Sequence, residues 1–326
     1  MTNAPRRRSR RPLIAVGALG LAVVLIGVAA IQTDTLGAGH LFDRAVAKVD
    51  RLLAGPVPDR SAPVTVVASD DPGDTGSDPP EDEESGAPDA APSPTQSGAP
   101  GPIVTPVAAP TATAEPTPKR VAVDVDVVKN HDKVFAHEIK DTWCAAAGVQ
   151  MVLAIFHKGD TSHDFQRELQ GRVRDWESYN DSHNGDWGPS AMALALKAYG
   201  VKGYEVRGYK TRQGALRGAA KAIEKTGSPA ILLAWRGAHT WVMTGFKADA
   251  DPAIFTDATI KGTYILDPWY PDVSSIWGPS DPPGTYQNDS EMVRNYLKWK
   301  RPEGHYPDRD GLYIAVVPTV VIKPVN

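Results

Sequence analysis

Large aromatic side chains are confined to one part of this chain, and this limits where a folded core can form. All eight Trp residues lie at position 143 or later, and no Phe, Tyr or Trp occurs between Phe42 and Phe135. A segment without large apolar groups cannot bury enough surface to offset the entropy lost on ordering. The sequence therefore predicts one folded domain over residues 120–326, which is an ordinary domain size.

The N-terminus has the pattern of a targeting segment. Residues 1–12 form a basic region with clustered arginines, and residues 13–31 (LIAVGALGLAVVLIGVAAI) follow without a charge. About 20 apolar residues span a bilayer as a helix, and preceding positive charge keeps the N-terminus in the cytoplasm. We expect a transmembrane signal anchor, or alternatively a signal peptide cut after Ala29 or Ala30. Either one places the remaining chain on the extracytoplasmic side, membrane-anchored or secreted.

Residues 32–119 are expected to connect this segment to the domain. Residues 32–55 fit a short amphipathic helix. Residues 56–119 are rich in Pro, Ala, Thr and Ser and contain the acidic run 81–84 (EDEE), which predicts a disordered, extended linker. We interpret the linker as a solvated spacer. The net charge of −4 on the whole chain gives no sign of a nucleic-acid partner.

Within the domain, helical patterns come first and strand patterns later, which predicts an α+β fold with an antiparallel sheet. The first helix is expected to be capped by Asp141 or Thr142 and the second by Thr161 or Ser162. The expected helices run to about residue 157, to about residue 176, over 189–199 and over 212–225. The expected strands lie at 121–128, 204–209, 230–235, 239–246, 262–266 and 311–321.

Cys144, the single cysteine, falls in the first turn of the first predicted helix. Unpaired N–H groups and the helix dipole favour negative charge there, so we expect a thiol that ionises readily. An ordinary thiol has a pKa of about 8.5 and is only a few per cent ionised at neutral pH. The small residues 145–148 (AAAG) would let another element approach closely. A buried structural cysteine is the alternative.

His239 and Asp267 are the other two candidate catalytic residues. His239 starts a predicted strand, with Trp241 and Met243 on the same face, and Asp267 ends the next one before Pro268. Each residue has an ordinary explanation, as a packed histidine or an Asp-Pro turn. Taken with a thiol at a helix start, they predict a Cys–His–Asp triad for nucleophilic catalysis.

The segments WCAAAGVQMVL, GAHTWVMTGF and YILDPW resemble the C39-like cysteine peptidases of the papain-like group. The resemblance covers residues 132–270. It implies a papain-like fold, with the Cys helix packed on an antiparallel sheet, Cys144 as nucleophile, His239 as general base and Asp267 as the orienting acid. It also implies a cysteine hydrolase that acts without a cofactor on a peptide or another amide or ester, through a thioester.

Two positions depart from the family pattern. The family places a Gln six residues before the Cys as oxyanion donor, and here that position is Glu138, next to His137; the usual Gly after the Cys is Ala145. An ionised carboxylate only accepts hydrogen bonds and would repel an oxyanion. Either His137 donates after a shift of one residue, or Glu138 is protonated. The alternative function is a non-catalytic cell-surface module on the same fold that binds peptide or wall polymer.

Two further sets of residues were considered for the site. Three tryptophans are candidate cleft walls, with core packing expected for at least one of them: Trp143, Trp187 and Trp241. A metal site was considered for four histidines, whose spacing matches no standard zinc pattern: His131, His137, His157 and His163. The sequence therefore predicts no metal centre.

Overall fold

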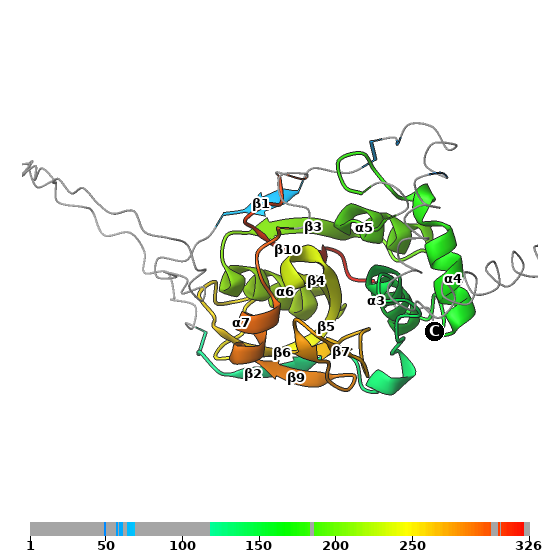
Figure 1. Cartoon of the computed structure of the whole chain (residues 1–326). Helices are drawn as coiled ribbons and strands as arrows, with labels where there is room; N and C mark the ends of the chain where they lie inside the picture. Colours follow the sequence, from blue (N-terminus) through cyan, green and yellow to red (C-terminus); the bar gives the residue numbers. More distant parts are fainter. Residues whose placement is uncertain are drawn as a thin grey trace, which may run out of the picture.

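The computed structural model describes residues 49, 57, 59–60, 64–68, 118–182, 186–300, 306 and 308–322 (Figure 1). Residues 13–31, which are predicted to span a membrane, lie outside this set. Among the described residues, no helix is both long enough and apolar enough to cross a bilayer. The membrane anchor, and the structure predicted for most of residues 32–119, therefore remain predictions.

The domain combines five helices with a sheet and a small separate hairpin in the described part of the chain. The helices are α3 (Cys144–Ile155), α4 (His163–Gly171), α5 (Pro189–Ala198), α6 (Arg212–Thr226) and α7 (Asp289–Asn295). The sheet strands are β1 (Thr65–Val67), β2 (Val123–Asp126), β3 (Tyr204–Tyr209), β4 (Ala230–Ala234), β5 (His239–Ala248), β6 (Ile260–Leu266), β9 (Thr285–Asn288) and β10 (Tyr313–Pro318). The hairpin consists of β7 (Val273–Ser274) and β8 (Gly278–Pro279).

The eight-stranded sheet has the order β1-β3-β10-β4-β5-β6-β9, and β2 pairs with β5 beside this path. Strand β5 is at its centre: β4 pairs with its first half, β2 with its second half, and β6 runs along its other edge. All pairings are antiparallel except that of β1 with β3. The predicted α+β class with a mainly antiparallel sheet is confirmed.

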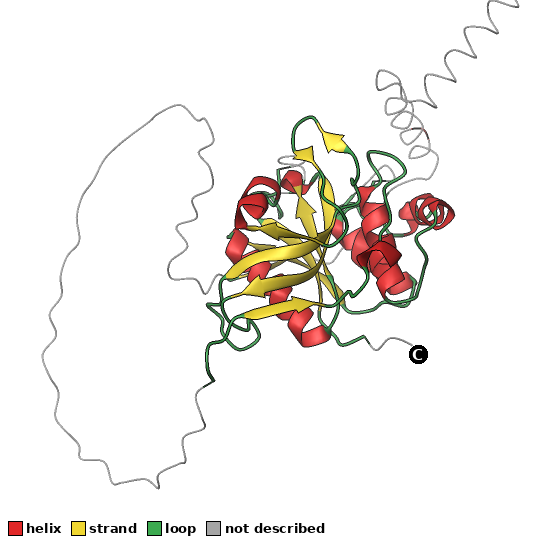
Figure 2. Ribbon diagram, turned by 90° about the horizontal axis from the view of Figure 1, so that it is seen from below, coloured by secondary structure: helices red, strands yellow, loops and turns green. Residues whose placement is uncertain are grey.

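The sheet divides the core in two, because successive side chains of a strand point to opposite faces. In β10, Ile314 and Val316 join one hydrophobic cluster, while Tyr313, Ala315 and Val317 join the other. Helices α3, α4 and α5 pack on the first face, and α6 and α7 pack on the second. Figure 2 shows the sheet between these two groups of helices.

The fold differs from the sequence prediction at α7, β9 and the β7–β8 hairpin, which were not predicted, and at β1 and the end of the second helix. Residues 65–67 lie in the predicted disordered linker but form β1, which pairs in parallel with the edge strand β3. The β-branched residues of Val64–Val67 suit a strand, and the open edge of β3 supplies the partner. The second helix ends at Gly171 rather than near residue 176, and a 3-10 turn at Val173–Asp175 follows it.

Candidate active site

Helix α3 carries Cys144 at its first position. The N-cap residue is Trp143, and no side chain caps this end of the helix. The prediction that Asp141 or Thr142 would cap it is therefore wrong: the chain makes a backbone turn, from Trp143 N to Lys140 O at 2.8 Å, before the helix begins. The N-terminus of α3 therefore has neither a capping side chain nor a carboxylate in its first turn.

A close contact between α3 and β5 sets the position of Cys144. A Cβ atom added at Gly148 would lie 2.5 Å from Thr240 Cγ2, so only glycine lets the helix approach this far. Four residues earlier on α3, Cys144 Sγ lies 4.0 Å from the carbonyl oxygen of Ala238, just before β5. The small residues after the cysteine thus allow the close approach expected from the sequence.

His239 and Asp267 are joined by a short, buried hydrogen bond. His239 begins β5, and Asp267 follows β6, the strand paired with β5. His239 Nε2 lies 2.7 Å from Asp267 Oδ1, and their side chains are only 2% and 7% exposed. Asp267 Oδ1 also accepts a hydrogen bond from Trp269 N at 3.0 Å. Because Nε2 faces the carboxylate, Nδ1 is the ring nitrogen left to exchange a proton with another group.

Aromatic rings fix the plane of the His239 imidazole. The Trp235 ring stacks on it with centroids 4.0 Å apart, and Trp269 meets it edge-on at 6.3 Å. Trp235 and the next residue, Arg236, both have positive φ angles, of 50° and 61°, which non-glycine residues rarely adopt. Strained backbone of this kind persists where the surroundings fix it, often at functional sites.

Gly237 completes this turn and cannot be replaced without disturbance. Its φ is 87°, and a Cβ atom there would lie 2.3 Å from the Trp299 ring. The turn between β4 and β5 therefore depends on this glycine, and it delivers Trp235 to the face of His239.

Cys144 and His239 open into the same cavity, of about 200 Å³. The wall residues come from α3, from the start of β5 and from two aromatic side chains, Trp187 and Trp299. Trp187 is held by a hydrogen bond from its Nε1 to Gln170 Oε1 at 2.8 Å. The structure thus brings the predicted nucleophile and base to one cavity and places the predicted acid behind the base.

The three tryptophans proposed as cleft walls have different environments. Trp187 lines the cavity, Trp143 is half-buried beneath the Lys140 ammonium, and Trp241 is 2% exposed in the core beneath α6 and α7. Trp241 is therefore a core residue, because the alternation along β5 turns it away from α3. Sequence reasoning missed the tryptophans around His239 and in the cavity wall: Trp235, Trp269 and Trp299.

Glu138 is buried in the same region without any partner for its carboxyl group. It is 3% exposed, and neither carboxyl oxygen has a hydrogen-bond partner. Burial, reinforced by the nearby charges of Asp267 and Asp141, raises the pKa of Glu138 from 4.5 to about 9. At neutral pH this carboxyl group is therefore protonated, and its O–H can donate a hydrogen bond.

The backbone on both sides of Glu138 is held by a buried glutamine. Gln166, on α4, accepts from Ile139 N at 2.8 Å and donates to the His137 carbonyl at 3.0 Å and to Gln150 Oε1 at 2.8 Å. Glu138 N donates to the carbonyl oxygen of Pro268 at 3.0 Å. Glu138 is thus fixed between α4 and the turn that carries Asp267. In the sequence, this arrangement is indicated only by two glutamines within predicted helices, Gln150 and Gln166, and such residues usually lie on the exposed face of a helix.

His137 is occupied by other partners. Its Nδ1 lies 3.1 Å from the carbonyl oxygen of Pro268, which can only accept, so Nδ1 donates there. Its Nε2 lies 3.8 Å from Asp272 Oδ2. Both ring nitrogens of His137 therefore face the 268–272 turn.

The thiol itself differs from the sequence expectation. Burial, and then the charge of Glu138, raise the pKa of Cys144 above that of an ordinary thiol, and hydrogen bonds from Thr240 and Ala145 offset this only in part. The expectation of a readily formed thiolate is therefore wrong for the closed site, because the desolvation of Sγ outweighs the helix N-terminus. Glu138 adds to the effect only where it is ionised, above about pH 9.

Among the described residues, no three His, Cys, Asp or Glu side chains come together as a metal site. Of the histidines considered for one, His131 bonds Asp126 with Nε2 and Oδ2 at 2.9 Å. His157 and His163 are exposed.

Comparison with known proteins gives weak structural likeness only. No family model matches the chain, and no curated protein matches it. A crystal structure of a double glycine motif protease from an AMS/PCAT transporter, in complex with the leader peptide, is similar at 19% identity and a TM-score of 0.29. The match covers 57% of this chain and 91% of that one. A likeness this low is a distant link to a C39 peptidase domain and carries no argument about activity.

Proposed function

We propose that residues 120–326 form a C39-like cysteine hydrolase with a papain-like fold, which cleaves a peptide or another amide or ester bond. Cys144 is the nucleophile, His239 the general base and Asp267 the group that orients the imidazole. The domain works on the extracytoplasmic side, attached through residues 13–31 or released from them. The observation that carries the proposal is the shared cavity of Cys144 and His239, with the 2.7 Å bond from His239 to Asp267 behind it.

The reaction starts from a neutral thiol. His239 Nδ1 takes the proton of Cys144 as Sγ attacks the substrate carbonyl carbon, which gives a tetrahedral oxyanion. Collapse breaks the bond to the leaving amine or alcohol, which receives the proton from the imidazolium and leaves a thioester on Cys144. Water, deprotonated by His239, then attacks the thioester, releasing a carboxylic acid and restoring the thiol. Asp267 holds the imidazole through Nε2 and stabilises its positive charge.

The oxyanion is stabilised by the protonated Glu138 and the backbone N–H of Cys144. A neutral carboxylic acid donates one hydrogen bond, as an amide side chain would at this position. Burial supports this role, because it keeps Glu138 protonated at neutral pH. The alternative function, a non-catalytic binding module, was based on the repulsion that an ionised Glu138 would exert on an oxyanion. A protonated Glu138 would not exert this repulsion.

Acylation of Cys144 by a simple activated ester tests the proposal. We expect the purified chain to gain one acetyl group on Cys144 from p-nitrophenyl acetate, detected by intact and peptide mass spectrometry. Removal of the base in His239→Ala should slow acylation by about 10²–10⁴, and added imidazole should restore part of the rate. Restoration by imidazole also shows that the variant is folded.

His163→Ala is the matched control, since His163 is exposed at the start of α4, away from the cavity. It should acylate at the wild-type rate. Equal rates for wild-type and His239→Ala, or undiminished acetylation of Cys144→Ala, would refute the proposal.

A further inference from the structure

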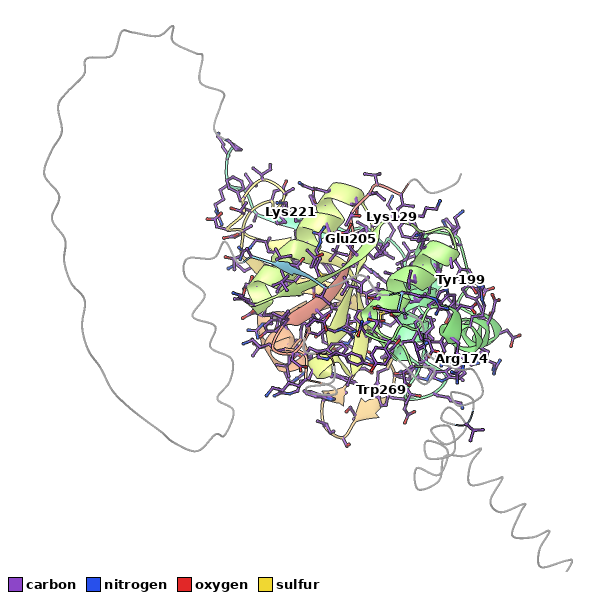
Figure 3. The ribbon with its side chains drawn as sticks, turned by 90° about the horizontal axis from the view of Figure 1, so that it is seen from above. Lys129, Arg174, Tyr199, Glu205, Lys221 and Trp269 are labelled. Carbon is purple, nitrogen blue, oxygen red and sulfur yellow. The ribbon has the colours of Figure 1, made fainter. Side chains whose placement is uncertain are left out.

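A second cavity, of about 360 Å³, runs along α6 on the sheet face opposite α3. Its walls are α6, the end of β3, the residues after β1 and β10, and the loop at 252–256. This volume lies within the range of about 300–1,000 Å³ found for small-molecule sites. In Figure 3, Lys221 of this cavity and Trp269, which contacts His239, lie on opposite sides of the domain. The cavity is therefore separate from the proposed active site.

The lining of this cavity is strongly basic. Its charged residues are Arg207, Lys210, Arg217, Lys221 and Lys225, and no Asp or Glu lines it. Arg207 pairs with Glu205 at 3.2 Å, whereas Arg217 donates to the carbonyl oxygens of Ala258 and Thr256 at 2.9 and 2.6 Å. These two carbonyl acceptors hold the guanidinium of Arg217 at the wall of the cavity.

Three of these cations lie on one stripe of α6. Arg217, Lys221 and Lys225 are four residues apart, so their side chains are neighbours. Like charges at this spacing destabilise a helix. Within the described part of the chain, no carboxylate forms a salt bridge with Lys221 or Lys225. An anion bound between these side chains would offset this repulsion.

Two neutral groups add hydrogen-bond donors to the same cavity. Tyr209 lines it, is 4% exposed, and has a hydroxyl without a hydrogen-bond partner. The hydroxyl lies against α6 where the helix has only hydrogen, since a Cβ atom at Gly218 would be 2.3 Å from it. The N-terminus of α6, capped by Thr211, also opens here, and its dipole favours an anion.

From this arrangement we infer that the α6 cavity binds a ligand that carries more than one phosphate charge. Lys210, Lys221 and Lys225, which form no salt bridge within the described part of the chain, match a multiply charged phosphate group better than a single carboxylate. The Tyr209 hydroxyl supplies a directed hydrogen bond. The ligand is either a soluble oligophosphate or the phosphate of a lipid headgroup, which present the same chemistry to the cavity.

Calorimetric titration of the purified full chain with sodium tripolyphosphate tests this inference. Saturable binding is expected, weakening with added salt. Lys221→Gln/Lys225→Gln should weaken it by about tenfold or more, as for the loss of two direct charge contacts. The matched control, Lys158→Gln/Lys202→Gln, changes the net charge equally at exposed positions outside the cavity. It should bind like the wild type, as should Cys144→Ala.

Tyr209→Phe provides a second variant that keeps the ring and removes only the unpartnered hydroxyl. It should fold and bind more weakly than wild type. Co-sedimentation with phosphatidylglycerol vesicles, compared between the two double-lysine variants, separates the sources, because both variants retain residues 13–31. Because residues 13–31 would attach both variants to any vesicle, the readout is the extra binding to phosphatidylglycerol over phosphatidylcholine vesicles, and loss of this extra binding in the cavity variant alone assigns the site to a headgroup. Absence of saturable binding to either probe, or equal weakening in both double-lysine variants, overturns the inference.

Discussion

Replacement of Glu138 by Gln isolates the energetic effect of one buried carboxyl group. Both oxygens of Glu138 are buried without partners, and the pKa of this group is about 9 in the folded domain against 4.5 for a free side chain. Gln has nearly the same shape as the neutral acid and cannot ionise. The variant therefore removes a titration while it keeps the packing.

Whether the free energy of unfolding rises or falls with pH depends on the number of protons bound by the folded and the unfolded chain. Below pH 4.5 the carboxyl group is protonated in both the folded and unfolded chains, and its contribution to stability is fully present. As the pH rises, the unfolded chain loses this proton first, so the free energy of unfolding falls by up to about 1.4 kcal/mol per pH unit. The fall ends at about pH 9, where the folded domain also ionises. For a domain of this size, this slope lowers Tm by roughly 3–5 °C per pH unit.

Thermal unfolding followed by circular dichroism, at several values between about pH 5 and about pH 9, measures this slope. We expect the Tm of Glu138→Gln to be close to that of wild type at the acid end and to exceed it by a margin that grows with pH. Glu205→Gln is the control, because Glu205 is exposed and should leave the slope unchanged. If the difference in Tm between Glu138→Gln and wild type stays constant over this range, the burial argument for Glu138 is refuted.

Two more predictions concern the same region. Glu138→Ala should slow acylation of Cys144 by about 10²–10³; Glu138→Gln should stay active and should keep its rate above about pH 9, where the wild type loses its donor. Stopped-flow acylation across pH checks this, and a wild-type rate in Glu138→Ala would contradict it. Gln166→Leu leaves Ile139 N and the His137 carbonyl without partners, which should lower the free energy of unfolding by about 1–3 kcal/mol for each buried group. Urea unfolding should show a lower midpoint, and an unchanged midpoint would count against a stabilising role of the Gln166 hydrogen bonds.

Much of the fold was predictable because local patterns and tertiary packing agree. Alternation of apolar residues located β5 and β10, and the start of α3 at Cys144 lies within the first predicted turn. The prediction failed at β1, where a short β-branched run pairs with an edge strand more than a hundred residues away in sequence. Such a pairing depends on unpaired backbone groups along one edge of β3, which the local sequence around residue 65 does not reveal.

The site was predictable in its chemistry and less so in its surroundings. A thiol at a helix start and an imidazole and carboxylate at strand ends are local features, and the sheet register brings the latter two together. The environment of His239 depends on the left-handed conformation of Trp235 and Arg236, which non-glycine residues seldom adopt. Of the three candidate cleft walls, Trp241 is a core residue, as expected for at least one of them, because the residues that share the face of His239 farther along β5 enter the core beneath α6.

The site gathers more acidic groups than can be charged together, and this determines how the thiol reacts. Cys144, Glu138 and Asp267 interact electrostatically in one buried region. Asp267 accepts two hydrogen bonds, whereas the carboxyl oxygens of Glu138 have no partner. Burial therefore opposes negative charge at Glu138 and at Cys144. In the proposed mechanism the thiolate forms as the His239 imidazole takes its proton, so that a positive charge appears beside the negative one. The activation of Cys144 in this proposal therefore depends on His239 and not on the helix N-terminus alone.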